Sequence, residues 1–381
     1  MLHAILPFIV ILPPLAYGVI SLFCASSFFN RERETAGVTP PVTILKPVKG
    51  MDAESFENFA SFCHQDYPDF QIIFCLASPD DPAIPVIERL RLTFPDTAIE
   101  LVVDGRIYGP NYKVCNLINA WPLTRHDIIV ICDSDIRVGK DFLREVTVPF
   151  ADPGVGLVTS LYRSSAIHGA AAAIEAMGFT AEMVPNVMVA LKLEGLSFAL
   201  GASMAVRREA LERIGGLAAL ADYLADDYQL GNKVHGAGWR LALSDYFVES
   251  VMHRESLGNI LSRQLRWART MRVSRPGGYF GSGLTQPFPA ALLALIVSGF
   301  DGYGLGAALL LYLIRCSIAL LFSRRYLRDN IFPRWLWLLP VRDMLAFCTW
   351  ALAFTGQRVR WRGHLFRLLP GGKIVEVAER G

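Results

Sequence analysis

The chain has 381 residues, of which 52% are hydrophobic and only 19% are charged, a composition that excludes a protein that is soluble along its whole length. The formal net charge of +2 is too small to indicate a nucleic-acid partner, and no basic run with interleaved aromatic residues supports one. Seven cysteines are scattered without a CxxC pair, which favours reduced thiols and a cytosolic soluble portion.

The N-terminal segment Ile5 to Phe29 is apolar and interrupted only by Pro13 and Pro14. It is long enough to cross a hydrocarbon layer of about 30 Å, so we predict a membrane anchor. A cleaved signal peptide is the alternative, but there is no Lys or Arg before Ile5 and no small-residue cleavage site follows. Arg31 and Arg33 follow the segment, which indicates that its far side is cytoplasmic.

Between Pro40 and about Ser250, short apolar runs alternate with amphipathic stretches, a pattern typical of an α/β domain. The predicted strands are Val42 to Leu45, Gln71 to Leu76, Ile99 to Val103 and Asp127 to Cys132. The predicted helices between them are Ala53 to Cys63, Pro82 to Phe94 and Tyr112 to Ala120. Successive strands should be parallel with right-handed crossovers, giving a doubly wound, nucleotide-binding type of sheet. Ligands bind such sheets beyond the carboxyl ends of the strands.

The remainder of the chain is predicted to meet the membrane. An amphipathic basic stretch runs from Leu257 to Arg275, and three hydrophobic segments follow: Gln286 to Phe300, Tyr303 to Phe322 and Trp335 to Phe354. Charges at bilayer depth are costly, and Arg342 and Asp343 lie in the middle of the third segment. We therefore expect the third segment to be re-entrant or interfacial rather than a full span.

The strongest chemical pattern is IIVICDSDI, Ile128 to Ile136, in which a buried type of strand is followed at once by Asp133 and Asp135. Two carboxylates in this arrangement can hold a hard cation such as Mg²⁺ or Mn²⁺ that also binds a nucleotide diphosphate. The alternative is a capped turn, in which Asp133 or Ser134 satisfies backbone amides ahead of a helix near Asp141.

A second acidic pair, Asp226 and Asp227 in ADDYQL, opens a helical pattern that continues to His235. Acidic residues at a helix N-terminus are favourable for dipole reasons alone, so a structural role is one interpretation. In the other, one carboxylate is the general base that takes the proton of an attacking lipid hydroxyl.

The motif RQLRW, Arg263 to Trp267, lies within the basic stretch before the membrane segments. An interfacial helix would use the arginines on lipid phosphates and the tryptophan at headgroup depth. Alternatively, Arg263 and Arg266 bind the donor diphosphate bidentately and Trp267 forms a wall of the acceptor pocket.

Further polar residues follow the second strand and precede the third helix. Asp80 or Asp81 could accept hydrogen bonds from a base or ribose, and Lys113 could meet phosphate. Turn formation by the sequence Pro79, Asp80, Asp81, Pro82 explains the acidic pair equally well.

Together with other stretches, these motifs carry a family resemblance. The matching stretches are ILKPVKG (Ile44 to Gly50), QDYPDFQIIF (Gln65 to Phe74), DDPAIPVIERL (Asp80 to Leu90), KVCNLI (Lys113 to Ile118), CDSDIRV (Cys132 to Val138), ADDYQL and RQLRW. Over about residues 40 to 275, the chain resembles the ceramide glucosyltransferases, glycosyltransferase family 21, which are similar to family 2. Hopanoid-associated bacterial glycosyltransferases resemble the same motifs.

The resemblance implies a glycosyltransferase-A fold and an inverting transfer of glucose from UDP-glucose to a ceramide-like lipid hydroxyl, with Mg²⁺ or Mn²⁺. The implied roles are a base at Asp227, with Asp226 next, metal binding at Asp135 and Asp133, an acceptor contact at Trp267, and donor contacts at Asp80, Asp81, Lys113, Asp133, Arg263 and Arg266. Animal members resemble CDSGI where this chain has Asp135, which leaves open which carboxylate binds the metal directly.

We expect a multi-pass integral membrane protein of a bacterial inner membrane or its equivalent. The predicted regions are an anchor over 1–30, a cytosolic catalytic domain over 40–255, an interfacial segment over 256–284, membrane segments over 285–357 and a basic tail over 358–381.

Three other functions compete with this interpretation. A hopanoid transferase would move N-acetylglucosamine from UDP-N-acetylglucosamine onto a hopanoid polyol, and the sequence does not separate it from the ceramide enzyme. A processive polysaccharide synthase would need a wider channel than these few segments offer. A non-enzymatic cation-binding membrane scaffold would have no use for RQLRW beside a nucleotide-type sheet.

Overall fold

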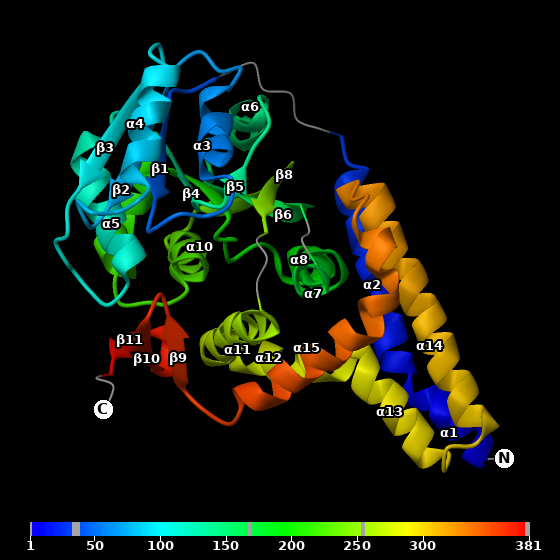
Figure 1. Ribbon diagram of the computed structural model, residues 1–381. Coiled ribbons are helices and arrows are strands. Elements are labelled where there is room, and N and C mark those ends of the chain that lie inside the picture. Colours follow the sequence, from blue (N-terminus) through cyan, green and yellow to red (C-terminus); the bar gives the residue numbers. More distant parts are fainter. Residues whose placement is uncertain (1, 33–38, 167–168, 253–255, 378–381) are drawn as a thin grey trace. The chain divides into compact units, whose positions relative to one another are not determined.

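The computed structural model describes residues 2–32, 39–166, 169–252 and 256–377 (Figure 1). It consists of two compact units. The sheet unit comprises Glu32–Ser165 and Glu194–His253, and the helical unit comprises Met1–Arg31, Ala166–Leu193 and Arg254–Gly381. Arg33, which was used above to orient the anchor, lies outside the described residues.

The sheet unit contains an eight-stranded sheet in the order β3-β2-β1-β4-β7-β6-β8-β5. Its strands are β1 (Val42–Pro47), β2 (Phe70–Leu76), β3 (Ala98–Val103), β4 (Ile128–Cys132), β5 (Ile136–Arg137), β6 (Val155–Ala166), β7 (Ser203–Arg207) and β8 (Arg240–Val251). The four predicted strands correspond to β1 to β4, and their predicted parallel pairing is confirmed. β7 then pairs antiparallel with both β4 and β6, so the sheet is mixed.

Helices pack on both faces of this sheet. They are α3 (Ser55–Cys63), α4 (Ile84–Thr93), α5 (Tyr112–Ala120), α6 (Phe142–Thr147), α9 (Arg208–Arg213) and α10 (Asp226–Gly236). Successive strand residues alternate between two hydrophobic cores, as the pleat of a strand requires: Ile44 faces α3, α4 and α6, whereas Leu45 faces α5, α9 and α10. Burial on both faces explains why β1 and β4 read as continuous apolar runs.

The helical unit is built from the two ends of the chain and one internal segment. Its helices are α1 (Leu2–Val10), α2 (Leu12–Phe29), α7 (Ala170–Gly178), α8 (Val184–Glu194), α11 (Leu257–Ser274), α12 (Pro276–Ser282), α13 (Pro287–Val297), α14 (Gly302–Leu321) and α15 (Leu339–Ala353). The predicted apolar segments and the amphipathic stretch all form helices. Within the described residues, four helical stretches are long and apolar enough to cross a membrane: His3–Phe29, Ala170–Glu194, Gly302–Leu327 and Phe332–Ala353. A fifth candidate is Pro276–Thr285 with Pro287–Val297, bent by 51°.

The predicted continuous domain over 40–255 is wrong at one place, because Ala166–Leu193 belongs to the helical unit. In this segment α7 packs Ala173, Ile174 and Met177 against residues of the C-terminal helices, including Ala319 and Leu339. The segment is nevertheless flanked by β6 and β7, which pair within one sheet. Both of its ends therefore lie on the same side of any membrane, and α7 and α8 cannot form a simple span.

The predicted basic tail is also not a tail in its described part. Residues up to 377 form a three-stranded antiparallel sheet of β9 (Arg358–Trp361), β10 (His364–Leu368) and β11 (Ile374–Glu376). Val359, Phe366 and Ile374 are buried, whereas Arg358, Arg360 and Arg367 are exposed. The alternation of apolar and basic residues thus reflects strands with one buried face.

Candidate active site

The sheet unit brings charged side chains together at the carboxyl ends of its parallel strands. β4 ends at Cys132 and is followed by Asp133, while Lys46 lies near the end of β1. Lys46 is fully buried, donates a hydrogen bond to the backbone oxygen of Asp133 (2.9 Å) and lies 3.7 Å from the ring centre of Phe62. Its burial lowers the pKa of the ammonium group to about 8, although the nearby carboxylates oppose this shift.

Lys113 connects the two acidic motifs that were singled out in the sequence. Its Nζ lies 2.7 Å from Oδ1 of Asp133 and 3.3 Å from Oδ2 of Asp226. Burial lowers the pKa of Lys113, but the charges of Asp133 and Asp226 outweigh burial and raise it, so the ammonium group stays charged. Asn111 caps the helix that carries this lysine, accepting from the backbone N–H of Val114 (3.1 Å).

Asp226 and Asp227 begin α10, which two glycines allow to pack closely. A side chain at Gly231 would collide with the backbone of Phe198 and Ala199, and a side chain at Gly201 would lie 2.8 Å from Oδ2 of Asp227. The cap residue of this helix is Ala225, and both aspartates lie in the first turn, which is where the dipole interpretation expected them. Asp226 also accepts from Asn111 (3.3 Å) and pairs with Lys113.

The carboxylate of Asp227 is held in an environment that disfavours its charge. Its Oδ1 accepts a hydrogen bond from the backbone N–H of Tyr228 (2.7 Å). Burial, followed by the negative charge of Asp226, raises the pKa of Asp227 to about 6, and Lys113 limits the rise. A carboxylate with a pKa near neutrality is a better proton acceptor than one with an ordinary pKa.

Asp135 belongs to the same concentration of negative charge. Burial first, then the charges of Asp133 and Asp52, raise the pKa of its carboxyl group to about 7. Oδ2 of Asp135 accepts a hydrogen bond from Ser250 (3.4 Å), and Ser134 donates to Asp52 (2.5 Å). Carboxylate oxygens under mutual repulsion fit a hard divalent cation. Among the described residues, no group of three or more His, Cys, Asp or Glu side chains could hold a metal, so such a cation would need other ligands besides this acidic pair.

The other acidic pair divides into two different roles. Both side-chain oxygens of Asp81 accept from the backbone N–H of Gly50 (2.9 and 3.2 Å), and Oδ1 also accepts from Ala83 (3.0 Å). The bond from Ala83 agrees with the turn interpretation, and the bonds from Gly50 in addition tie the loop after β1 to the loop after β2. Asp80 is exposed and is the member of the pair that can reach a ligand.

The three RQLRW residues lie on α11 of the helical unit, which Ser256 caps by accepting from Asn259 (3.2 Å). Nε of Arg263 donates to the buried carboxylate of Glu175 on α7 (2.7 Å). The guanidinium group of Arg266 lies 5.9 Å from the ring centres of both Trp267 and Trp361, and Trp267 is 39% exposed. Arg263 and Arg266 therefore take part in contacts within the helical unit.

Sequence reasoning missed several residues that contact the predicted ones, namely Lys46, Asp52 and Asn111 in the sheet unit and Glu175 in the helical unit. Lys46 had a detectable signal, because it is the one charged residue in the apolar strand VTILKP. Asp52 contacts Ser134 across 82 residues of sequence, Asn111 contacts Asp226 across 115, and Glu175 contacts Arg263 across 88. No local sequence pattern indicates contacts over such separations.

A sequence profile of Glycosyl transferase family 21 matches residues 6–374. The chain belongs to this family. It is 26% identical to ceramide glucosyltransferase 3 of Caenorhabditis elegans over 88% of this chain and 74% of the relative. It is 24% identical to ceramide glucosyltransferase 1 of the same organism, over 93% of this chain and 78% of the relative. The resemblance stated from the motifs is thereby confirmed.

A solved structure agrees with this family 21 fold. The mannosyltransferase PcManGT from Pyrobaculum calidifontis, in complex with GDP-Man and Mn²⁺, superimposes with a TM-score of 0.58 at 20% identity, covering 91% of this chain and 99% of that chain. The predicted glycosyltransferase-A fold with apolar helices towards both termini is confirmed.

Proposed function

We propose that this family 21 protein transfers glucose from UDP-glucose to the hydroxyl group of a ceramide-like membrane lipid, with inversion at the anomeric carbon. The observation that carries the proposal is the position of Lys113 between Asp133 and Asp226, beside Asp227, at the carboxyl ends of the parallel strands. This is the edge at which sheets of this type bind nucleotides. The names of the two nematode relatives support the choice of donor sugar and acceptor.

In the proposed reaction the lipid oxygen attacks the anomeric carbon, the bond to the diphosphate oxygen breaks, and its electron pair leaves with UDP. Asp227 accepts the proton of the attacking hydroxyl, for which its raised pKa suits it. Lys113 remains charged, so it would bind a phosphate oxygen of the donor in addition to its ion pair with Asp133. Asp80 would accept hydrogen bonds from the nucleoside.

The acidic pair after β4 would hold Mg²⁺ or Mn²⁺, with Asp135 as the direct ligand and Asp133 beside it. When bound, the cation offsets the charge that develops on the departing diphosphate. Asp133 already pairs with Lys113, whereas repulsion from Asp133 and Asp52 disfavours the charge of Asp135, and this difference supports the assignment. Donor phosphate oxygens and water would complete the coordination.

Arg263 and Arg266 would bind the diphosphate and Trp267 the acceptor. Glu175 orients Arg263, since Nε and Nη2 of the guanidinium group both face its carboxylate. A guanidinium group held in one orientation is suited to charge-assisted hydrogen bonds with phosphate oxygens.

The catalytic sheet unit would face the cytosol, where UDP-sugars are made. If His3–Phe29, the bent pair and Gly302–Leu327 cross and Phe332–Ala353 does not, the C-terminal sheet lies on the same side as the sheet unit. Its arginines then obey the positive-inside bias. We expect a cysteine introduced at exposed Arg360 to resist a membrane-impermeant maleimide in intact cells and to react after permeabilisation. Labelling in intact cells would contradict this topology.

The experiment that tests the function uses the purified full chain in lipid nanodiscs. UDP-glucose and UDP-N-acetylglucosamine are each offered with ceramide or with a hopanoid polyol, and products are identified by mass spectrometry. We expect β-glucosylceramide from the first donor with the first acceptor, formed about 100- to 10,000-fold more slowly by Asp227→Asn. Transfer of N-acetylglucosamine to the hopanoid alone would replace the proposed substrates. Hydrolysis or polymer formation without any lipid product would overturn the proposal.

A further inference from the structure

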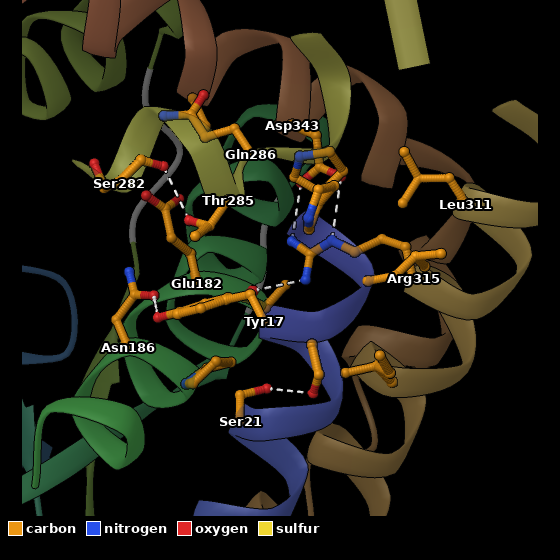
Figure 2. A pocket seen from close by; sticks show the side chains of 18 residues that line it. Tyr17, Ser21, Glu182, Asn186, Ser282, Thr285, Gln286, Leu311, Arg315 and Asp343 are labelled. Carbon is orange, nitrogen blue, oxygen red and sulfur yellow. Dashed lines mark hydrogen bonds and ion pairs between the residues drawn. The ribbon is translucent and has the colours of Figure 1, made fainter. Parts of the chain in front are cut away.

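The helical unit contains a polar cavity of about 110 Å³, and none of the residues that line it has a role in the reaction proposed above (Figure 2). Its walls come from α2, from the start of α8 and the turn before it, from the segment ahead of α13, and from α14 and α15. All of these elements belong to, or adjoin, the candidate membrane helices. A polar cavity among apolar helices has a cost in lipid that a ligand would offset.

The three charged side chains in its wall each have a partner of opposite charge. Nη2 of Arg315 lies 3.0 Å from Oδ1 of Asp343, and Nη1 of Arg315 donates to the backbone oxygen of Ala181 (3.0 Å). Glu182 pairs with Arg342 (2.5 Å), which lies behind the wall rather than in it. Because every charge in the wall is already paired, the cavity favours an uncharged ligand over an anionic or a cationic one.

The remaining polar groups in the wall are hydroxyls and amides. Tyr17 donates to Oδ1 of Asn186 (2.5 Å), and Thr285 donates to the backbone oxygen of Ser282 (2.9 Å). Oε1 of Gln286 is buried and has no hydrogen-bond partner within the described residues. Figure 2 shows Tyr17 and Asn186 in contact, with Glu182, Ser282, Thr285 and Gln286 on the same side of the cavity. Such groups match hydroxyl and amide groups of a ligand.

The backbone around the cavity is irregular at two places. A π-helical turn, Phe179–Met183, places Ala181 and Glu182 in its wall, and the 51° bend at Gln286 separates Pro276–Thr285 from Pro287–Val297. Irregular backbone at membrane depth is tolerated where it lines a cavity, and π-helical turns occur frequently at functional sites. Both irregularities therefore point to binding rather than to packing alone.

We propose that this cavity binds the polar head of a neutral membrane lipid that carries hydroxyl and amide groups. By the volume one water molecule needs, the cavity holds on the order of seven to ten water-sized groups, enough for such a head but not for its chains. Val19, Ile20 and Phe23 of α2 are exposed and would contact the chains. That the lipid is the acceptor rests on the proposed function, whereas the binding itself does not.

The test measures lipid binding by the full chain in phosphatidylcholine nanodiscs without any nucleotide. The probe is a ceramide with a diazirine in its acyl chain, titrated and photolysed. Tyr17→Phe removes one hydroxyl and Asn186→Leu removes one amide, whereas Ser317→Leu makes a similar change on α14 at an exposed position outside the cavity. We expect the dissociation constant to rise about two- to tenfold in each cavity variant, as for a lost hydrogen bond, and to stay unchanged in Ser317→Leu.

Binding of UDP to the same samples reports whether each variant is folded. Unlabelled ceramide should compete with the probe, and phosphatidylglycerol should not. Equal labelling of wild type and both folded cavity variants would overturn the inference, as would equal competition by phosphatidylglycerol. Labelling that depends on Tyr17 and Asn186 in a protein that transfers no glucose supports the cavity and removes the proposed acceptor. If the protein glucosylates ceramide but labelling does not depend on Tyr17 and Asn186, the result supports the proposed acceptor and overturns binding in this cavity.

Discussion

The two units hold their charged side chains in opposite ways. In the sheet unit, two lysines share the charges of five carboxylates, and the residues concerned are Lys46, Lys113, Asp52, Asp133, Asp135, Asp226 and Asp227. In the helical unit, three arginines each pair with a single carboxylate: Arg263 with Glu175, Arg315 with Asp343 and Arg342 with Glu182. An excess of negative charge prepares a site for a cation and a proton, whereas one-to-one pairs let charges remain in an apolar surrounding.

The largest effect expected from this difference is the loss of activity when the cation is removed. We predict that Asp135→Ala abolishes transfer and leaves the fold intact, and that excess chelator abolishes transfer by the wild type. Both follow because the charge on the departing diphosphate would no longer be offset. Radiolabelled glucose transfer, with Mn²⁺ titrated back, measures this.

Asp141→Ala is the matched control, since Asp141 is an exposed carboxylate just before α6, at the place where the capped-turn interpretation expected a helix. It should keep its activity and its metal dependence. Full turnover by the wild type in chelator would show that the acidic cluster serves another purpose.

The next largest effect concerns Asp227. We predict that Asp227→Asn lowers turnover about 100- to 10,000-fold, the usual contribution of a positioned base, because the amide cannot accept the proton. The affinity for UDP-glucose should change little, since the base faces the acceptor. Single-turnover kinetics and donor binding by calorimetry separate the two quantities.

Asp226→Asn is the neighbouring control and should reduce turnover less. Asp226 acts through its contacts with Lys113 and Asn111 rather than on the acceptor. If a well-folded Asp227→Asn protein turns over at the wild-type rate, Asp226 becomes the candidate base.

The paired charges of the helical unit should show the opposite behaviour, with single replacements more harmful than double ones. We predict that Arg315→Met or Asp343→Leu alone lowers the free energy of unfolding by about 3–5 kcal/mol, because each leaves a buried charge without its partner. The double variant should lie close to the wild type. Denaturant unfolding in detergent measures these differences.

An exposed pair in the sheet unit supplies the contrast. Arg91 and Glu88 lie one helical turn apart and are each 48% exposed, so Arg91→Met should cost at most about 0.5 kcal/mol.

For the buried pair, a double variant of Arg315 and Asp343 as unstable as the single ones would show that this pair stabilises the helical unit in its own right.

How far the sequence predicts this molecule also differs between its regions. β1, β2 and β4 were predicted because strands buried on both faces are continuous apolar runs bounded by polar turns. β6 and β8, of 12 residues each, were missed, because Ser, Thr, Arg and Glu interrupt them and their pairing partners lie far along the chain. α7 and α8 were missed because an apolar segment inside a predicted domain resembles core.

The site residues divide in the same manner. Asp133, Asp135 and Asp227 follow a strand or begin a helix, so their positions at the edge of the sheet could be predicted from local patterns. That Lys113 joins Asp133 to Asp226 could not, since the contact depends on how α5 and α10 pack on one face of the sheet. The difference between Asp80 and Asp81 could not be predicted either, since it depends on the hydrogen bond that the backbone N–H of Gly50 donates to Asp81.

The smallest expected effect is a pH dependence that tests whether the acidic cluster acts as a unit. With saturating Mn²⁺, kcat/KM should fall about tenfold per pH unit below about pH 6, because the raised pKa of Asp227 leaves its base form scarce there. Asp226→Asn should move this limb to lower pH, since the charge of Asp226 raises the pKa of Asp227. Lys113→Met should move the limb to higher pH, since the lysine lowers that pKa.

Folding stability should respond to pH in the opposite sense. The folded-state pKa of Asp227 lies above its unfolded value, so its protonated form stabilises the fold fully below about pH 3.9, and that contribution is lost as the pH rises through about 6. Asp227→Asn carries no charge at any pH, so its stability relative to the wild type should begin to rise at about pH 3.9 and reach its full gain above about pH 6, where the wild type is active. A limb that stays in place in both Asp226→Asn and Lys113→Met would mean that another group controls the rate. The limb is predicted to move, and stability to change in the opposite direction. If both occur, the excess of negative charge that makes the sheet unit reactive also destabilises it.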